Sequence, residues 1–387
     1  MAISAKTGTF LVPTGSTSVI SITGVGFTPL GIIFWWSGRG DATNANGTAS
    51  HSVGTGFASA TTKRWAYSHQ STHNVNPPQS DRSGRADCCI LTITHAAAPT
   101  YDCIADITQI NSDGFQITPT QASSVDLRVS YLALAGAPFT NIQADTFAQT
   151  NVTGAQTPTT GIAFTPNAGI FVTQDFGNAF PRISAHGSHS IGVALSSSNR
   201  WVMAEGAADG ASGPDTAAYA YTGECYAAPQ DTGPHSLQQR TNFTAWTATG
   251  LTVDVLETAI AERVIWMAFA GASVAAGTFS TRTDSNDISV TGLGFTPAAV
   301  FLVSTNRVLS TQDVGTSSSQ MSIGAFTQDL SCISHAIRDN DVANPTVVST
   351  AIRYDQAYIN LSSTGTISGL CKPIAVTADG FTMSCAD

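Results

Sequence analysis

Few side chains in this chain could do chemistry, and their spacing does not match a known catalytic motif. His69 and His73 are four residues apart, a spacing that brings two imidazoles together only on a helix. Residues 65–76 have no helical pattern, so we interpret this pair as part of a polar loop. His51 and His189 both lie in a Ser-His-Ser sequence, which indicates a shared structural hydrogen bond.

Motifs of enzymes and metal sites are also missing from the sequence. There is no G-x-S-x-G elbow, P-loop, H-E-x-x-H or EF-hand loop. The acidic pair Asp339 and Asp341 favours a solvated turn, with weak calcium binding as the alternative. We therefore expect no catalytic residue, no cofactor and no metal site.

Tryptophans are the remaining candidates for a contact with another molecule. Trp35 and Trp36 are adjacent, and neighbouring side chains of a strand point to opposite faces, so one ring is expected to be exposed or at an interface. Trp65 and Trp201 have polar neighbours and would suit stacking on sugar rings. The candidate surface or ligand contacts are therefore Trp35, Trp36, Trp65 and Trp201.

The elements that must position these residues recur along the chain. Gly26-Phe27-Thr28-Pro29 returns as Ala163-Phe164-Thr165-Pro166 and as Gly294-Phe295-Thr296-Pro297, each followed by an apolar run. The phenylalanines are 137 and 131 residues apart, which is the size of a domain. Other landmarks keep this register, including the Arg-Trp pairs and Cys89 and Cys225. The sequence predicts three units, which span residues 1–136, 137–271 and 272–387.

The third unit lacks its closing strand. Unit 1 closes on the apolar run 129–136 and unit 2 on the run 264–271, whereas the equivalent run of unit 3 would end near residue 402, beyond Asp387. Two explanations are open. A partner chain could supply the strand, as in donor-strand pairing, or the sequence is truncated, which we favour.

Each unit has the strand pattern of an antiparallel β-sandwich or jelly roll. Residues 255–263 contain good helix formers, but their counterpart in unit 1 contains Pro119, so we expect no helix there. In unit 1 the apolar or alternating runs lie near residues 8–12, 17–23, 31–37, 50–58, 63–68, 88–94, 102–110, 114–118 and 127–135. The fold class is all-β, with three tandem β-sandwich units.

Composition excludes several classes of function. The net charge is −10 and the chain has 16 Lys and Arg in all, so no basic cluster could neutralise nucleic-acid phosphates; the Arg82 to Arg85 segment is interpreted as a solvated loop. No apolar run is long enough to span a membrane, and the N-terminus has no secretory signal. Seven cysteines without a C-x-x-C pair are interpreted as reduced core residues, with metal or disulfide use as the less favoured alternative.

The motifs resemble a repeat unit of structural proteins of tailed bacteriophages. The resemblance rests on the Gly-Phe-Thr-Pro phrase, the Ile-Ile-Phe-Trp-Trp strand, an Asp-Gly-Phe turn and the closing Tyr-Leu-Ala-Leu-Ala-Gly run, and unit 1 fits best. It implies a virion component of the fibre, spike or capsid-decoration type. The Phe-x-Pro entry to an apolar strand is also similar to H-type lectin sandwiches.

Three functions follow as hypotheses. The first is a non-enzymatic virion structural protein, a homo-oligomer such as a trimer, which contacts other virion proteins and a host-surface glycan, is assembled in the host cytoplasm and is released by lysis. The second is a lectin-like carbohydrate-binding protein. The third, a glycan-degrading enzyme, would need two carboxylates at a set separation, and no glutamate recurs between the units.

Overall fold

The computed structural model describes residues 3–386 except 175–176, 211–214, 230–235, 282–283, 285, 306, 308–315 and 342–344. The described residues form antiparallel β-sheets and no α-helix. The predicted all-β sandwich-type fold is confirmed. Residues 255–263 lie in two strands and the turn between them, as expected from the counterpart in unit 1.

Unit 1 contributes eleven strands, ten of which form a two-layered sandwich. Its inner sheet has the order β1-β11-β3-β5-β6-β7, and its outer sheet the order β2-β10-β9-β8. The strands are β1 (Ser4–Val12), β2 (Ile20–Ile22), β3 (Gly31–Trp36), β4 (Ala45–Thr48), β5 (His51–Ala60), β6 (Lys63–Ser71), β7 (Ser80–Arg85), β8 (Ile90–Ile93), β9 (Tyr101–Asn111), β10 (Gly114–Gln121) and β11 (Leu127–Ala135).

Unit 2 repeats this order. Its inner sheet runs β12-β22-β14-β16-β17-β18 and its outer sheet β13-β21-β20-β19. The strands are β12 (Asn141–Gln149), β13 (Gly154–Gln156), β14 (Ala168–Thr173), β15 (Arg182–Ala185), β16 (Gly187–Ser196), β17 (Asn199–Ala207), β18 (Thr216–Thr222), β19 (Tyr226–Pro229), β20 (Leu237–Thr247), β21 (Gly250–Thr258) and β22 (Glu262–Ala270).

Unit 3 has the same outer sheet, in the order β23-β31-β30-β29, but a shorter inner one, β24-β26-β27-β28. Among its described residues there is no counterpart of β1 or β11, so β24 is an edge strand. The strands are β23 (Ile288–Val290), β24 (Ala299–Thr305), β25 (Thr316–Ser317), β26 (Ser319–Thr327), β27 (Cys332–Asn340), β28 (Val347–Arg353), β29 (Tyr358–Leu361), β30 (Ile367–Thr377) and β31 (Gly380–Ala386).

The three units are interlocked by an exchange of short strands. In each unit the Phe-Thr-Pro phrase precedes an inner-sheet strand, which is β3, β14 or β24. The next strand along the chain leaves its own sandwich and extends the inner sheet of a neighbouring unit. Thus β4 of unit 1 pairs with β28 of unit 3, β15 of unit 2 with β7 of unit 1, and β25 of unit 3 with β18 of unit 2. The exchange closes a ring, in which every unit gives one strand and receives one.

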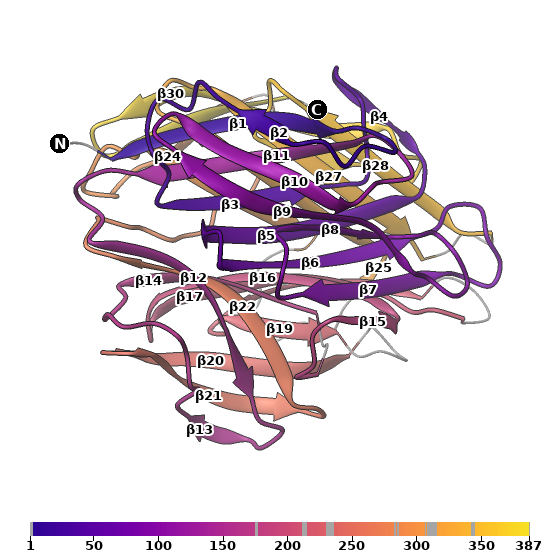
Figure 1. Cartoon of the computed structure of the whole chain (residues 1–387), viewed down its shortest axis with the longest axis horizontal. Coiled ribbons are helices and arrows are strands. Elements are labelled where there is room, and N and C mark those ends of the chain that lie inside the picture. Colours follow the sequence, from indigo (N-terminus) through magenta and orange to yellow (C-terminus); the bar gives the residue numbers. More distant parts are fainter. Residues whose placement is uncertain are drawn as a thin grey trace.

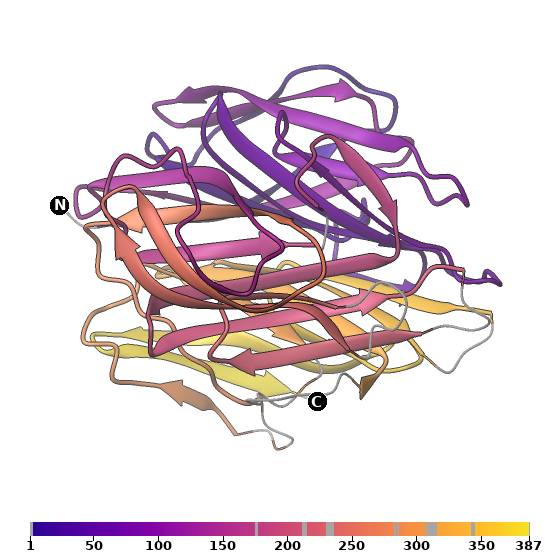
Figure 2. The ribbon, with the colours of Figure 1, turned by 90° about the horizontal axis from the view of Figure 1, so that it is seen from below.

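The inner sheets pack against one another at the centre of the molecule. Figure 2 shows unit 1, in indigo and violet, and unit 3, in yellow, on opposite sides, and Figure 1 shows unit 2 below unit 1. One hydrophobic core joins all three, with Trp35, Met267 and Ile323 among its members, while each sandwich has a separate core between its own two sheets. The inner sheets are therefore buried on both faces.

Two of the recurring motifs are coupled by hydrogen bonds. The Asp113 carboxylate accepts hydrogen bonds from the backbone amides of Gly24 (3.0 Å) and Gly26 (2.7 Å), and Asp379 does the same for Gly292 (2.9 Å) and Gly294 (2.7 Å) in unit 3. These bonds lower the pKa of both carboxyls. Unit 2 has Thr249 in place of the aspartate and Ala163 in place of the second glycine, so both partners change together.

A close approach of the two layers fixes the register of the repeat. A Cβ on Gly56, Gly192 or Gly324 would overlap a backbone carbonyl of the outer sheet, from Cys89, Cys225 and Ala357 respectively. In this register His189 of unit 2 corresponds to Val53 of unit 1, two residues from His51. The expectation that His51 and His189 occupy equivalent positions and form an equivalent hydrogen bond is therefore wrong.

The cysteines differ in part from the expectation. Cys88, Cys89, Cys103, Cys225 and Cys332 are free and buried, as predicted. Cys371 and Cys385 form a disulfide, because they are opposite one another on the neighbouring strands β30 and β31. The register of the two strands, and not a C-x-x-C spacing, produces the pair.

Candidate functional site

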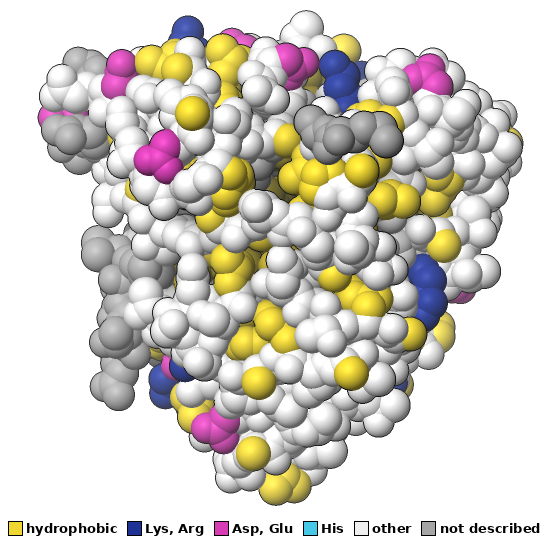
Figure 3. All heavy atoms as spheres, turned by 90° about the vertical axis from the view of Figure 1, so that its left-hand side faces the viewer, with side chains coloured by type: hydrophobic (Ala, Val, Ile, Leu, Met, Phe, Trp, Pro, Cys, Tyr) yellow, Lys and Arg dark blue, Asp and Glu magenta, His cyan; other side chains and the backbone are white. Residues whose placement is uncertain are grey.

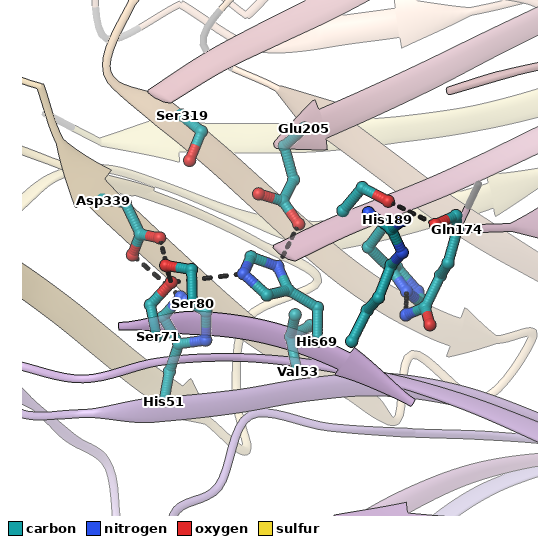
Figure 4. Close-up of polar contacts among 12 residues, drawn as sticks. His51, Val53, His69, Ser71, Ser80, Gln174, His189, Glu205, Ser319 and Asp339 are labelled. Carbon is teal, nitrogen blue, oxygen red and sulfur yellow. Dashed lines mark hydrogen bonds and ion pairs between the residues drawn. The ribbon is translucent and has the colours of Figure 1, made fainter. Parts of the chain in front are cut away.

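A cluster of buried polar side chains lies where the three units meet. Figure 4 shows His51, His69 and Ser71 from β5 and β6 of unit 1 facing Glu205 from β17 of unit 2 and Asp339 from β27 of unit 3. We call these five residues the polar centre. Their exposure is 2% or less except for Asp339, at 3%.

His69 and Glu205 form a fully buried ion pair across units 1 and 2. The His69 Nδ1 lies 2.6 Å from the Glu205 Oε1, and both side chains have 0% exposure. Burial alone would lower the pKa of His69, but the charges of Glu205, Asp339 and Asp81 raise it above its ordinary value. The raised pKa favours the protonated ring, whose charge compensates the buried carboxylate.

Asp339 is held by hydrogen bonds from unit 1. The His51 Nε2 lies 2.8 Å from its Oδ1, and the Ser71 hydroxyl donates to its Oδ2 at 2.6 Å. Burial raises the pKa of this carboxyl, but His51, His69 and Ser71 together hold it below its ordinary value. The carboxylate is therefore ionised and links unit 3 to unit 1.

The other two buried histidines of the inner sheets are neutral. The His189 ring bonds Thr55 of unit 1 (3.0 Å) and Gln174 (3.0 Å), and burial lowers its pKa to about 3. The His335 ring lies between the hydroxyls of Ser37 (2.9 Å) and Ser130 (2.8 Å), with its pKa also lowered to about 3 by burial. A neutral imidazole has one donor and one acceptor nitrogen, which suits two hydroxyl or amide partners.

His51, His69 and Asp339 have donor atoms within 4.8 Å of one another, and they are the one group among the described residues that could hold a metal ion. However, these atoms already form hydrogen bonds with each other and with Ser71 and Glu205. The arrangement therefore fits a structural polar centre that joins units. With all of its members enclosed, a substrate could not reach it without opening the unit interfaces.

Several sequence-based interpretations of these side chains are wrong. His69 lies in strand β6 and not in a polar loop, and Asp339 is buried in β27 and not in a solvated turn. Arg82 has 3% exposure and lies in strand β7, where it donates to the His186 carbonyl at 3.0 Å. Each of these residues is polar, so a sequence pattern based on apolar residues could not identify its strand as buried.

The candidate tryptophan contacts are mostly internal. Trp35 and Trp36 have 0% exposure and Trp65 has 8%, so these three are not surface contacts. Trp35 is nevertheless at an interface, since its ring lies 5.9 Å from that of Phe301 in unit 3. Trp201 alone is partly exposed, and it lines a groove.

This groove is lined by residues of all three units. It has a volume of about 470 Å³, and its lining includes residues of β24 and residues 273–279. Figure 3 views this face, where hydrophobic side chains gather in the hollow. Its lining is mostly apolar and includes Leu134, Ile170, Trp201, Phe279, Val300 and Phe301.

No protein-family model, no curated protein and no solved structure matches this chain. Within the described residues, no helix is long and apolar enough to cross a membrane.

Proposed function

We propose that the chain is a non-enzymatic structural protein of a bacteriophage virion, of the fibre, spike or capsid-decoration type. The observation that supports this most is the strand exchange, which ties three sandwiches into one interlocked body. A particle component must resist shear and local unfolding, and closing every exchange within one chain favours such resistance.

The position of the polar side chains supports a role without catalysis. His51, His69, Glu205 and Asp339 are enclosed at the unit interfaces, where they pair with each other. Buried polar pairs of this kind specify which surfaces meet. In this proposal the protein assembles in the host cytoplasm with other virion proteins, as a homo-oligomer such as a trimer, and contributes to attachment to a host-surface glycan.

Immunogold labelling of purified particles tests the proposal, with an antibody raised against the recombinant chain. Labelling of heads would support a decoration protein, and labelling of tail tips or fibres would support attachment. Preincubation of the antibody with the recombinant chain is the control. Particles that remain unlabelled would overturn the virion proposal, and binding on a glycan array would then favour the carbohydrate-binding alternative.

A further inference from the structure

The polar centre lies where equivalent positions of the three units meet. His69 and Glu205 are each opposite the third residue of the preceding strand, in β5 and β16, and they contact one another across units 1 and 2. Ser71 and Asp339 are each opposite the first residue of the preceding strand, in β5 and β26, and they contact one another across units 1 and 3. Equivalent residues of a closed ring meet only near its rotation axis. The polar centre therefore lies close to a pseudo-threefold axis, where all three units can contribute to one site.

Three side chains of the polar centre bring possible metal ligands together. Imidazole nitrogens of His51 and His69 and a carboxylate oxygen of Asp339 lie within 4.8 Å of one another. One of these separations, between the His51 Nε2 and the Asp339 Oδ1, is 2.8 Å. Ligand atoms around a tetrahedral zinc ion are about 3.3 Å apart, because each lies about 2.0–2.1 Å from the metal. Small shifts of these side chains would therefore be enough to enclose an ion.

His69 already has the orientation of a metal ligand. Its Nδ1 lies 2.6 Å from the Glu205 Oε1, and its Nε2 lies 3.2 Å from the Ser71 hydroxyl. Gly187 makes room for this Nε2, since a Cβ at that position would lie 1.9 Å from it. Histidines that bind metals usually donate their other ring proton to a carboxylate, which fixes the tautomer and the orientation of the ring. Glu205 thus occupies the position of such a supporting carboxylate.

The hydrogen bonds of the polar centre leave buried polar atoms unused. The Ser319 hydroxyl belongs to a side chain with 0% exposure and has no hydrogen-bond partner within the described part of the chain, and the same holds for the Glu205 Oε2 and the His51 Nδ1. Figure 4 shows the Ser319 hydroxyl directed into the space between Asp339 and Glu205. Buried polar groups are nearly always partnered. These atoms therefore point to a further polar or ionic partner at this place.

The charges of the polar centre also suit a divalent cation. The carboxylates of Glu205 and Asp339 are both enclosed, and the groups that face them are two imidazoles and the Ser71 hydroxyl. Asp81 and Arg82 of β7, which are also buried, have opposite signs. Buried charges are tolerated when they are paired or coordinate a metal. One ion of charge +2, with both imidazoles neutral, would balance the two carboxylates.

We propose that the polar centre binds one zinc ion, held by the Nε2 atoms of His51 and His69 and the Oδ1 of Asp339, with a serine hydroxyl next to the fourth position. Two nitrogen ligands and one carboxylate oxygen form a ligand set typical of Zn²⁺, whereas Ca²⁺ and Mg²⁺ prefer oxygen ligands alone. The ion replaces the proton that His51 shares with Asp339 and the Nε2 proton of His69. It joins units 1 and 3 directly, and unit 2 through Glu205.

Metal supplied during expression tests the site, because an enclosed ion must enter while the units close. The full chain is produced in medium supplemented with Co²⁺, which adopts the same ligand geometry as Zn²⁺ and absorbs visible light, and is then dialysed against a chelator. We expect about one Co²⁺ per chain by elemental analysis, with the intense visible absorption of a tetrahedral complex. Protein from medium with Zn²⁺ should instead contain zinc and be colourless.

Substitutions show which residues hold the ion. His51→Gln should lose the retained metal, because a ligand is removed. Glu205→Gln acts through His69 and should weaken the affinity for Co²⁺ by about 10–100-fold in competition with a chelator. The control is His335→Gln, a buried histidine outside the polar centre, which should keep the ion and its spectrum. Circular dichroism shows whether each variant is folded.

The unsubstituted chain keeps the proposal falsifiable even where a variant does not fold. Folded protein without retained metal would overturn the proposal, as would Co²⁺ with the weak absorption of a six-coordinate complex. A folded His51→Gln protein with an unchanged spectrum, or loss of the spectrum in folded His335→Gln, would overturn the assigned ligands. Retention of the tetrahedral ion would support the site whether or not particles are labelled, so this test and that of the virion role are independent.

Discussion

The buried histidines adopt different charge states because their partners differ. His69 faces the Glu205 carboxylate, which raises its pKa, whereas His189 and His335 face hydroxyl and amide groups, and burial lowers their pKa. The three rings lie on inner strands of three different units. The polar contacts of the interfaces are thus not symmetric, although the strand order repeats.

Acid should destabilise the protein well above the ordinary pKa of carboxyl groups. His189 and His335 have a pKa of about 3 in the fold and 6.5 when unfolded, so their stabilising contribution is present above pH 6.5 and is lost as the pH falls towards 3. His95, whose pKa burial lowers to about 4, acts in the same direction. Asp81, whose pKa is raised from 3.8 to about 6, acts in the opposite direction, as do Asp106, Asp145 and His69, whose pKa values are also raised. We expect the urea midpoint to fall between pH 7 and pH 4.

The variant His335→Gln should reduce this pH dependence, because it removes one of the histidines whose pKa is lowered by burial. At pH 7 it should also cost about 1–3 kcal/mol of stability, since one of the hydroxyls of Ser37 and Ser130 is left without a well-placed partner. Urea unfolding at pH 7 and pH 4 measures both effects. A pH dependence identical to that of the original protein would contradict the assignment of His335.

Glu205→Gln should weaken the contact between units 1 and 2. The amide keeps an acceptor for His69 but removes the negative charge that raises the pKa of the ring. Breaking one side of a buried ion pair costs about 3–5 kcal/mol, and the retained hydrogen bond would place this variant at the lower end. The control is Glu257→Gln on the exposed side of β21, which should change the free energy of unfolding by less than about 0.5 kcal/mol.

The polar centre could not have been predicted from the sequence. Its partners are far apart in the chain, as for His51 and Asp339, which are separated by 288 residues. No motif links them, because they belong to different units and meet only through the packing of three sheets. The tryptophans were more visible in the sequence, but most of them fill cores.

At the scale of elements, apolar strands were predictable and polar ones were not. In unit 1 the predicted runs correspond to β1–β3, β5, β6 and β8–β11, whereas β4 and β7 were missed. Their sequences are Ala-Asn-Gly-Thr and Ser-Asp-Arg-Ser-Gly-Arg. Both are strands at unit interfaces, where cross-strand hydrogen bonds and polar contacts replace hydrophobic alternation. The strand exchange could therefore not be predicted, because the exchanged strands have sequences that resemble loops.

Proline scanning of β15 should locate the hydrogen bonds of one exchanged strand. Ile183 and Ser184 are opposite Ser83 and Arg82 of β7, and alternate residues of an antiparallel edge strand point their amides towards the partner. One of Ile183→Pro and Ser184→Pro should therefore remove a ladder bond and speed amide exchange in β7, and the other should have the smaller effect. Slow exchange in both variants would show that the pairing does not hold β7 in place.

The spacing between the two layers depends on the glycines that contact the outer-sheet carbonyls. Gly192→Ala should cost about 1–3 kcal/mol or more, because the new methyl group overlaps the Cys225 carbonyl, which is backbone and cannot rotate away. Gly277→Ala is the matched control, since its Cβ would meet no atom within 4 Å. Thermal unfolding compares the two, and equal melting temperatures would contradict the close approach.

At the scale of the whole molecule, the units should unfold together. The central core contains residues of all three units, and each inner sheet ends on a strand from a neighbour. Calorimetry should show one transition, with a van't Hoff enthalpy near the calorimetric value. Residues 1–136 expressed alone should bind a hydrophobic dye, since their inner sheet would lose its cover. Separate transitions for the three units would contradict this cooperativity.

The pairing of β4 with β28 also means that β4 is synthesised long before its partner. Thr48 is opposite Ser349, so the partner of Thr48 is translated 301 residues later. At translation rates of roughly 5–20 residues per second, β4 waits for about 15–60 s before its partner is synthesised. A hydrophobic strand that is exposed for this time would promote aggregation. The polar sequence of β4, Ala-Asn-Gly-Thr, can instead remain hydrated until its partner is available. The polar sequence that concealed this strand is what allows the nascent chain to leave it unpaired until the ring can close.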